Sequence, residues 1–486
     1  MNIWILTIGS SDVQLKANSV DKWKPLFEKV KNQCHNLTFS VEKSKTAPND
    51  PIPVPARVMG LVYGGQLDKH YNHLAFPLID AFSQQLIEKD TPDKIIVLLT
   101  NQTKVFGDPK RRLKKCPYWQ DTCTLQPILE KHLKEKFPSA EQDYSYCLQP
   151  QSGDNGLDDW DKTLQLVKQT LSTLQVNEKD TIYVSHQAGT PAISSAVQFI
   201  SLAKFGKQVK FVVSNEYHKS TNLIPSPKYL WEIKLQEVTA LLKRYDYDGV
   251  QDILKSLIAE WDKTSDSKIK EIRELLEIAI TWNLADFDKF KTLVEKRGEP
   301  EKNRVNTWWW SGYEAGYLAV VRLEQGNIVE AMFHSFRAVE GLLRKWVDKT
   351  YPPQQGKEKK VELICNGTTK TFNRYGKGLY DCLDKHYYNQ HNRNIDSIQN
   401  EDIWKFGNVT FNKRNDLFHQ LLGMQEVQIF QDWDTQNQQD WESRVLGCLN
   451  FIAEPKPLFS SLETASLMSQ IHQELVNAIA SYKHPI

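Results

Sequence analysis

Residues 181–191 have the sequence TIYVSHQAGTP, in which a short apolar run is followed by a polar loop. The β-branched and aromatic residues of 181–185 predict a buried strand. The loop 186–191 leads into a helical pattern over residues 192–205, AISSAVQFISLAKF. A strand, a polar loop and a helix in this order are the unit from which parallel α/β sheets are built.

The same pattern recurs elsewhere in the first half of the chain. Residues 2–8 (NIWILTI), 94–100 (KIIVLLT) and 208–213 (QVKFVV) predict further strands. Helical patterns lie between the strands, at 74–88, 124–136 and 160–174. Near-continuous apolar strands suit a parallel sheet that is covered on both faces. We therefore expect a Rossmann-like, doubly wound sheet over residues 1–235.

Three of the predicted strands end in polar loops. The first is followed by Gly9-Ser10-Ser11-Asp12, the second by Asn101-Gln102-Thr103, and the third by 186–191. In open α/β sheets, ligands bind at the carboxyl ends of the strands. The three loops should meet there and form a binding site.

A basic stretch follows the second of these loops. We weigh two roles for it, contact with phosphate and a merely solvated surface. Its basic residues are Lys104, Lys110, Arg111, Arg112, Lys114 and Lys115.

The second half of the chain is predicted to be all-α. Amphipathic patterns cover 236–257, 268–284 and 286–297, and a long helix runs from Asn327 to about residue 349. Asn327 and Glu330 fit a capping box at its start. One face of this helix is apolar and predicts a core or a dimer seam: Met332, Phe333, Phe336, Val339, Leu343 and Trp346. Segment 350–375 is expected to be a solvated loop. The division predicted is an α/β domain (1–235), a helical connector (236–305) and a helical domain (306–486).

Composition narrows the class of protein. The 486 residues carry a net charge of +1, with 40% hydrophobic and 25% charged residues, as is usual for globular proteins. We find no run of 18 apolar residues and no signal peptide, and seven scattered cysteines lack a C-x-x-C pair. A cytoplasmic protein without a membrane span, a disulfide framework or a metal site is therefore expected.

Several common active-site motifs are missing from the sequence. There is no G-x-G-x-x-G after the first strand, no G-x-x-x-x-G-K-[ST], no H-E-x-x-H and no G-x-S-x-G. These absences argue against a dinucleotide dehydrogenase, a P-loop NTPase, a zinc protease and an α/β-hydrolase.

The sequence RNDLFH, residues 414–419, contains the remaining candidate for catalysis. Its histidine, His419, titrates near neutral pH and can transfer the protons of phosphodiester cleavage. Arg414 can stabilise the negative charge that builds on the phosphoryl oxygens. Asn415 lies four residues before His419 and can orient the imidazole or bind phosphate. We expect the motif at the start of a helix that follows a turn at Gly407-Asn408; the alternative is a surface arginine and an incidental histidine.

Arg337 and Glu340 lie three residues apart on the predicted long helix. An ion pair within or between helices is the favoured interpretation, and direct participation in catalysis is the alternative.

These motifs together resemble the CARF-HEPN ancillary ribonucleases of type III CRISPR systems. The resemblance spans nearly the whole chain and rests on motifs whose order and spacing match the family: TIGSSDVQL (7–15), YWQDT (118–122), HQAGTPAISSAVQF (186–199), RYDYDGVQDIL (244–254), GNIVEAMFHSFRAVEGLL (326–343) and RNDLFH (414–419). The last of these matches the family's R-x4-6-H signature.

The resemblance implies a mechanism of antiviral defence. Two CARF domains of a homodimer would bind a cyclic tetra- or hexa-adenylate activator, and two HEPN domains would form one composite site that cleaves single-stranded RNA without metal. His419 would act as acid and base, and Arg414 and Asn415 would bind phosphate. The residues implied around the activator are Gly9, Ser10, Ser11, Asp12, Gln102, Gln187, Gly189 and Thr190. No other cofactor is implied.

Two competing functions stay open at this point. The chain can be a non-catalytic CARF sensor that acts through a helical dimerisation module, in which case Arg414 and His419 are incidental. A stand-alone HEPN toxin is a weaker alternative, since it does not explain the large α/β domain.

Overall fold

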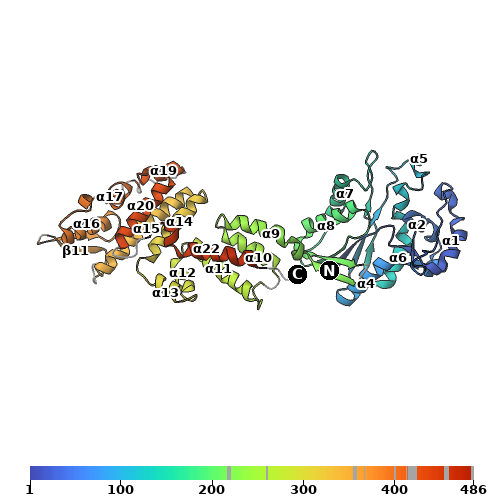
Figure 1. The fold of residues 1–486 in the computed structure, drawn as a ribbon, viewed down its shortest axis with the longest axis horizontal. Helices are drawn as coiled ribbons and strands as arrows, with labels where there is room; N and C mark the ends of the chain where they lie inside the picture. The colour runs from blue at the N-terminus through green and yellow to red at the C-terminus, as the bar shows by residue number, and fades with distance from the viewer. Residues whose placement is uncertain are drawn as a thin grey trace. The chain divides into compact units, whose positions relative to one another are not determined.

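The computed structural model describes residues 1–215, 220–258, 261–353, 358–365, 367–398, 401–411, 413, 424–453 and 459–482. Contacts divide the chain into two compact units, Met1–Trp231 and one that begins at Glu232 (Figure 1). The first unit is α/β and the second is predominantly helical, which confirms the fold class predicted from the sequence. The three-part division with boundaries near 235 and 305 stays a prediction.

The first unit is built on a central parallel sheet. Its strand order is β10-β9-β8-β1-β5-β6, with β7 also paired to β5. Three of the predicted strands are found within one residue of the expected ends, as β1 (Asn2–Thr7), β5 (Lys94–Thr100) and β8 (Thr181–Ser185). The fourth, β9 (Val209–Asn215), extends two residues further and pairs with the antiparallel β10 (Ser220–Pro225). Two short strands complete the sheet: β6 (Glu141–Asp143) and β7 (Cys147–Leu148).

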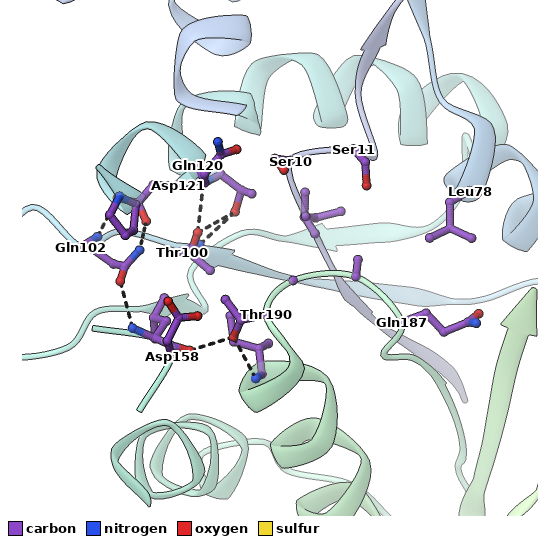
Figure 2. Close-up of a pocket in the computed structure, with 18 of the residues that line it drawn as sticks. Ser10, Ser11, Leu78, Thr100, Gln102, Gln120, Asp121, Asp158, Gln187 and Thr190 are labelled. Atoms are coloured by element: carbon purple, nitrogen blue, oxygen red, sulfur yellow. Dashed lines mark hydrogen bonds between the residues drawn. The ribbon is translucent and has the colours of Figure 1, made fainter. Parts of the chain in front are cut away.

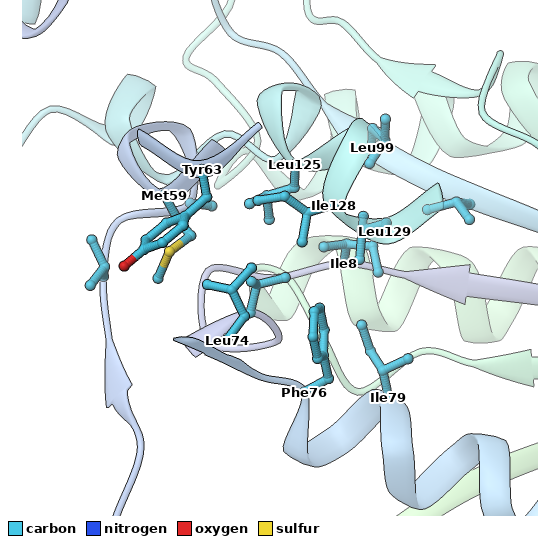
Figure 3. Packing of buried hydrophobic residues seen from close by; sticks show 14 of the residues in the cluster. Ile8, Met59, Tyr63, Leu74, Phe76, Ile79, Leu99, Leu125, Ile128 and Leu129 are labelled. Atoms are coloured by element: carbon cyan, nitrogen blue, oxygen red, sulfur yellow. The ribbon is translucent and has the colours of Figure 1, made fainter. Parts of the chain in front are cut away.

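The middle strand β1 faces two separate hydrophobic cores, because successive side chains of a strand point to opposite faces. Ile3 and Ile5 belong to the core beneath α7 (Trp160–Ser172) and α8 (Pro191–Phe205). Trp4 and Leu6 belong to the other core. Figure 3 shows part of that core, including Ile8 and Leu99. That core lies beneath α2 (Ala56–Tyr63), α4 (Pro77–Lys89) and α6 (Gln126–Lys136). The continuous apolar sequence of the strand thus follows from burial on both sides.

The predicted helices of this unit are present, with one shifted start. The pattern at 74–88 begins with β4 (Leu74–Ala75), which joins β2 (Gln14–Leu15) and β3 (Ile52–Pro53) in a small second sheet. The helix itself begins at Pro77, whose fixed φ suits the first turn. The remaining helices of the unit are short: α1 (Val20–Phe27), α3 (Leu67–His70) and α5 (Asp108–Arg111).

The second unit contains the remaining helices and one hairpin. Their bounds are α9 (Ser226–Leu242, which begins in the first unit), α10 (Tyr247–Leu257), α11 (Ser267–Asn283), α12 (Phe287–Val294), α13 (Glu299–Val305), α14 (Trp310–Glu324), α15 (Ile328–Thr350), β11 (Lys360–Cys365), β12 (Thr368–Asn373), α16 (Lys377–His391), α17 (Glu401–Lys405), α19 (Glu426–Asp432), α20 (Gln438–Ala453), α21 (Leu462–Ala465) and α22 (Leu467–Ser481). None of the described helices is both long and apolar enough to cross a bilayer.

Two predictions for helices in this unit were wrong in detail. The single helix expected over 236–257 is interrupted because Tyr245 adopts a positive φ of 55° and Asp246 caps a new helix by accepting from the Gly249 amide at 3.1 Å. Asn327 makes no side-chain cap at α15, and Glu330 pairs with Arg322 at 2.6 Å. The capping box is therefore replaced by an ion pair.

The segment predicted as a solvated loop, 350–375, contains the hairpin β11–β12 instead. Val361 and Leu363 alternate with exposed residues and are each 3% exposed, so the hairpin buries one face. The charges around 358–360 concealed this short alternation.

The predicted turn at Gly407-Asn408 lies in a π-helical turn, Phe406–Thr410. A Cβ atom at Gly407 would lie 2.4 Å from the Tyr380 ring, and Asn408 donates to the Tyr380 hydroxyl at 3.3 Å. The glycine is thus required by close packing rather than by a turn.

The predicted apolar face of α15 is buried over most of its length. Met332, Phe336, Val339 and Leu343 are 2% exposed or less, whereas Phe333 is 42% exposed. The stripe is therefore core along most of the helix.

Candidate ligand-binding site

A polar cavity of about 490 Å³ lies at the carboxyl edge of the central sheet (Figure 2). The loops that follow β1, β5 and β8 all contribute to its wall, as the strand order requires. Seven of the eight residues implied by the family resemblance line it: Gly9, Ser10, Ser11, Gln102, Gln187, Gly189 and Thr190. The loops in which the sequence predicts a binding site thus line one cavity, and ligand binding there stays a prediction.

Ser10 and Ser11 lie in the loop after β1 and present hydroxyl groups at the cavity. Among the described residues, neither hydroxyl has a protein hydrogen-bond partner, so both can contact a ligand. Asp12, the eighth residue, has a different role. It is 1% exposed, and its carboxylate accepts from the Gly9 amide at 2.6 Å, which closes the turn that presents the two serines.

Gln102 is fixed by hydrogen bonds within the protein. Its side-chain amide donates to Asp121 at 3.0 Å, and its side-chain carbonyl accepts from the Leu157 amide at 2.9 Å. The other Asp121 oxygen accepts from the backbone amide of Gln102 at 2.8 Å. Gln102 therefore joins two segments of the cavity wall, and one donor and one acceptor position of its side-chain amide remain.

Asp121 also forms a buried ion pair that sequence reasoning did not identify. The Arg57 guanidinium lies 2.8 Å from Asp121, with side-chain exposures of 8% and 0%. Arg57 also donates to the Tyr118 carbonyl at 2.8 Å and to Asn101 at 3.1 Å, and it lies 3.9 Å from the Tyr118 ring centroid. Buried charges require such partners. Arg57 thus holds the loop after β5 and the turn at 118–122 together.

The backbone of the loop 186–191 lies close to the backbone of the loop that follows β1. A Cβ atom at Gly9 would lie 2.8 Å from the Gly189 amide, and Gly189 has a φ of +94°, which favours glycine. Thr190 caps α8 by accepting from the Ile193 amide at 3.3 Å, and its hydroxyl donates to the Leu157 carbonyl at 2.7 Å. The N-terminus of α8 is thereby directed at the cavity, where its dipole favours an anion.

Two further residues of this loop bind the protein itself. Gln187 donates to the Ser214 carbonyl at 2.9 Å and accepts from the Ser214 amide at 2.6 Å. His186 lies 3.1 Å from the Ser194 hydroxyl through Nδ1, and burial lowers its pKa below the usual value. The imidazole is therefore neutral at pH 7 and adds no charge to the site.

The ionisable residues that line the cavity are Lys115, Asp158 and the buried Asp121, whose charge is paired with Arg57. The basic segment 104–115 thus brings a single cation to the cavity. Its Arg111 donates to the Thr103 and Phe106 carbonyls at 2.6 Å each, and its Arg112 pairs with Asp108. The sequence did not indicate Asp158, because this residue lies in an irregular loop that is not one of the three loops following the predicted strands.

The three proposed catalytic residues, Arg414, Asn415 and His419, lie outside the described residues. Upstream on α15, Glu340 accepts from the Gly376 amide at 3.0 Å, and the Arg337 guanidinium lies 5.7 Å from the Phe287 ring centroid. Among the described side chains, Arg337 makes no ion pair with Glu340, so the predicted i, i+3 pair is not formed. No group of three potential metal ligands occurs in the described part of the chain.

Comparison with known proteins gives one informative likeness. No family model matches the chain, and no curated protein matches its sequence. The solved structure of Enterococcus italicus Csm6 bound to cyclic hexa-2'-fluoro-hexa-dAMP is similar over 98% of this chain and 100% of that chain, with a TM-score of 0.57 and 11% identity. At this identity the likeness shows the fold, and it extends over both units.

Proposed function

We propose that this chain is an endoribonuclease of the CARF-HEPN kind, activated by cyclic oligoadenylate and acting in type III CRISPR antiviral defence in the cytoplasm. The observation that carries the proposal is the polar cavity at the carboxyl edge of the sheet. The likeness to Csm6 supports it, because that protein was solved with a cyclic hexanucleotide.

The cavity offers the groups that a cyclic oligonucleotide needs. The hydroxyls of Ser10 and Ser11, the N-terminus of α8 and the Lys115 ammonium can bind phosphate oxygens. Gly9, Asp12, Gln102, Gln187, Gly189 and Thr190 set the shape of the wall. A ring with repeated nucleotides suits two copies of the site related by two-fold symmetry, so we propose a homodimer.

The proposed RNA-cleaving site is carried by Arg414, Asn415 and His419. His419 takes the proton of the ribose 2′-hydroxyl or gives one to the leaving 5′-oxygen, and Arg414 stabilises the charged phosphoryl group. Asn415 orients the imidazole or binds phosphate. These roles require no metal ion.

The direct test is cleavage of a fluorogenic single-stranded RNA by the purified protein. We expect cleavage with cyclic tetra- or hexa-adenylate, none without an activator, and an unchanged rate in EDTA. Activator binding without any cleavage would instead support the non-catalytic sensor. Loss of cleavage in EDTA with the fold preserved would contradict the metal-free mechanism.

Substitution of Gly189 tests the assignment of the activator site. Gly189→Ala places a side chain at a φ of +94° and within 3.3 Å of Ile193. The strain costs about 1–2 kcal/mol, and relieving it moves the loop, so we expect about tenfold weaker binding of cyclic hexa-adenylate by calorimetry. Gly153→Ala is the matched control, since Gly153 has the same φ and no atom within 4 Å of its added Cβ. Equal affinities of the two variants would place the activator elsewhere.

A further inference from the structure

A second cavity, of about 310 Å³, lies within the helical unit. It is bounded by the turn before α12, the first turn of α14 and the middle of α15. The residues that matter for its chemistry are Asp288, Ser311, Arg337, Gly341 and Lys345. None of them has a role in the activator site or in the proposed catalytic motif.

Arg337, Gly341 and Lys345 lie on one face of α15, because residues four apart in a helix are neighbours. Arg337 and Lys345 are about 12 Å apart along the helix axis, at 1.5 Å per residue. A Cβ atom on Gly341 would meet nothing within 4 Å, so the space between the two cations is open. Both long side chains can therefore reach a group bound above the glycine.

The two cations are not neutralised by ion pairs. Among the described residues, no carboxylate lies within 4 Å of either one. The Lys345 ammonium donates to the Ser311 hydroxyl at 2.7 Å, and the Arg337 guanidinium lies over the Phe287 ring. Burial lowers the pKa of Lys345, an effect that Asp288 opposes. The ammonium is thus held at Ser311 on the exposed side of the helix without a bonded counter-ion.

Neighbouring groups add to the attraction for an anion. No side chain caps the first turn of α14, and Trp310, Ser311 and Gly312 of that turn line the cavity. The positive end of the helix dipole therefore adds to the two cations. Two aspartates also line the cavity, and both repel an anion. Asp286 is held in place by capping α12 through the Lys289 amide at 3.0 Å, whereas Asp288 makes no such cap.

We propose that this cavity binds a phosphate group of the single-stranded RNA substrate, through Arg337, Lys345 and Ser311. The proposal rests on the proposed ribonuclease function and adds an anchoring site to it, outside the residues that carry out cleavage. The group that we expect in the cavity is a phosphodiester of the RNA. Free phosphate or a mononucleotide offers the same phosphate oxygens and is the alternative ligand.

The test is binding of a fluorescein-labelled single-stranded RNA, measured by anisotropy at several salt concentrations. Arg337→Ala and Lys345→Ala should each weaken binding about threefold to fivefold, as for exposed charge pairs, and lower the salt slope by about 1. Arg344→Ala is the matched control, because Arg344 is an exposed cation of the same helix whose guanidinium lies 4.0 Å from Asp348. It should change neither quantity.

Two more variants test the site without removing a positive charge. Asp288→Asn should tighten RNA binding, since it removes a repelling carboxylate. Gly341→Leu should weaken it, since the side chain fills the open space while both cations remain. Loss of an exposed helical glycine costs the fold nothing, and thermal melting verifies this.

The outcomes separate this inference from the proposed function. If Arg337→Ala and Lys345→Ala bind RNA like Arg344→Ala, the phosphate site is wrong even though RNA is cleaved. If their binding is weakened but no activator produces cleavage, the phosphate site stands and the ribonuclease is wrong. Displacement of the RNA by equimolar inorganic phosphate or AMP would assign the cavity to a free anion and overturn the proposal, as would failure of the wild-type protein to bind RNA.

Discussion

His419→Ala is expected to abolish RNA cleavage while the affinity for the cyclic activator stays unchanged. Loss of general acid–base catalysis costs about 10²–10⁴ in rate, and this histidine would serve both proton transfers. Arg414→Ala should lose about 10²–10³, because charge building on the phosphoryl group would lack its counter-ion. Among the described residues the activator cavity is lined by the first unit, whereas both substitutions lie in the second.

The experiment compares initial rates with the fluorogenic RNA and activator affinities by calorimetry. His391→Ala is the matched control, since His391 is an exposed histidine of the helical unit whose ring is tilted against that of Tyr387, with the centroids 4.3 Å apart. It should cleave at the wild-type rate. Cleavage by His419→Ala at that rate would remove the motif from the mechanism, and weakened activator binding would show that the substitution disturbs more than catalysis.

The second large effect is expected from Arg57→Ala. Removing the guanidinium leaves the fully buried Asp121 carboxylate without its counter-ion, and breaking a buried pair in this way costs about 3–5 kcal/mol. The hydrogen bonds of Arg57 to Tyr118 and Asn101 are lost as well. The turn at 118–122 and the loop after β5 should then separate, so activator binding should fall together with the free energy of unfolding.

Urea unfolding followed by circular dichroism measures the loss. Arg112→Ala provides the control, because Arg112 and Asp108 form a pair at 3.5 Å with exposures of 72% and 59%, and such pairs contribute about 0–1 kcal/mol. Arg57→Lys keeps the charge without the planar fork and should fall between the two. A loss below about 1 kcal/mol for Arg57→Ala would mean that Asp121 finds another partner.

The sequence predicted those parts of the site that local patterns encode. Apolar runs fixed the ends of β1, β5 and β8, and parallel strands bring their following loops to one edge. Ser10, Ser11 and Gly189 therefore line one cavity, and their contact with a ligand stays a prediction. The catalytic motif is a prediction of a different kind, since its residues lie outside the described part of the chain.

What the sequence did not reveal depends on long-range contacts. Arg57 and Asp121 are 64 residues apart, and no local pattern joins them. Gln102 stays a predicted ligand contact, but no local pattern showed that its side chain also bridges Asp121 and Leu157. Polar residues at the end of a strand can satisfy the protein or the ligand, and only the tertiary structure distinguishes the two.

The hydrogen bonds between Gln187 and Ser214 connect the ligand loop to the end of β9. β9 pairs antiparallel with β10, and β10 is followed directly by α9, the helix in which the chain passes from the first unit to the second. A ligand that shifts the 187–190 loop must therefore displace these two strands or break the two hydrogen bonds between Gln187 and Ser214. We therefore expect this one glutamine side chain to transmit occupancy of the cavity to the segment that leads to the helical unit.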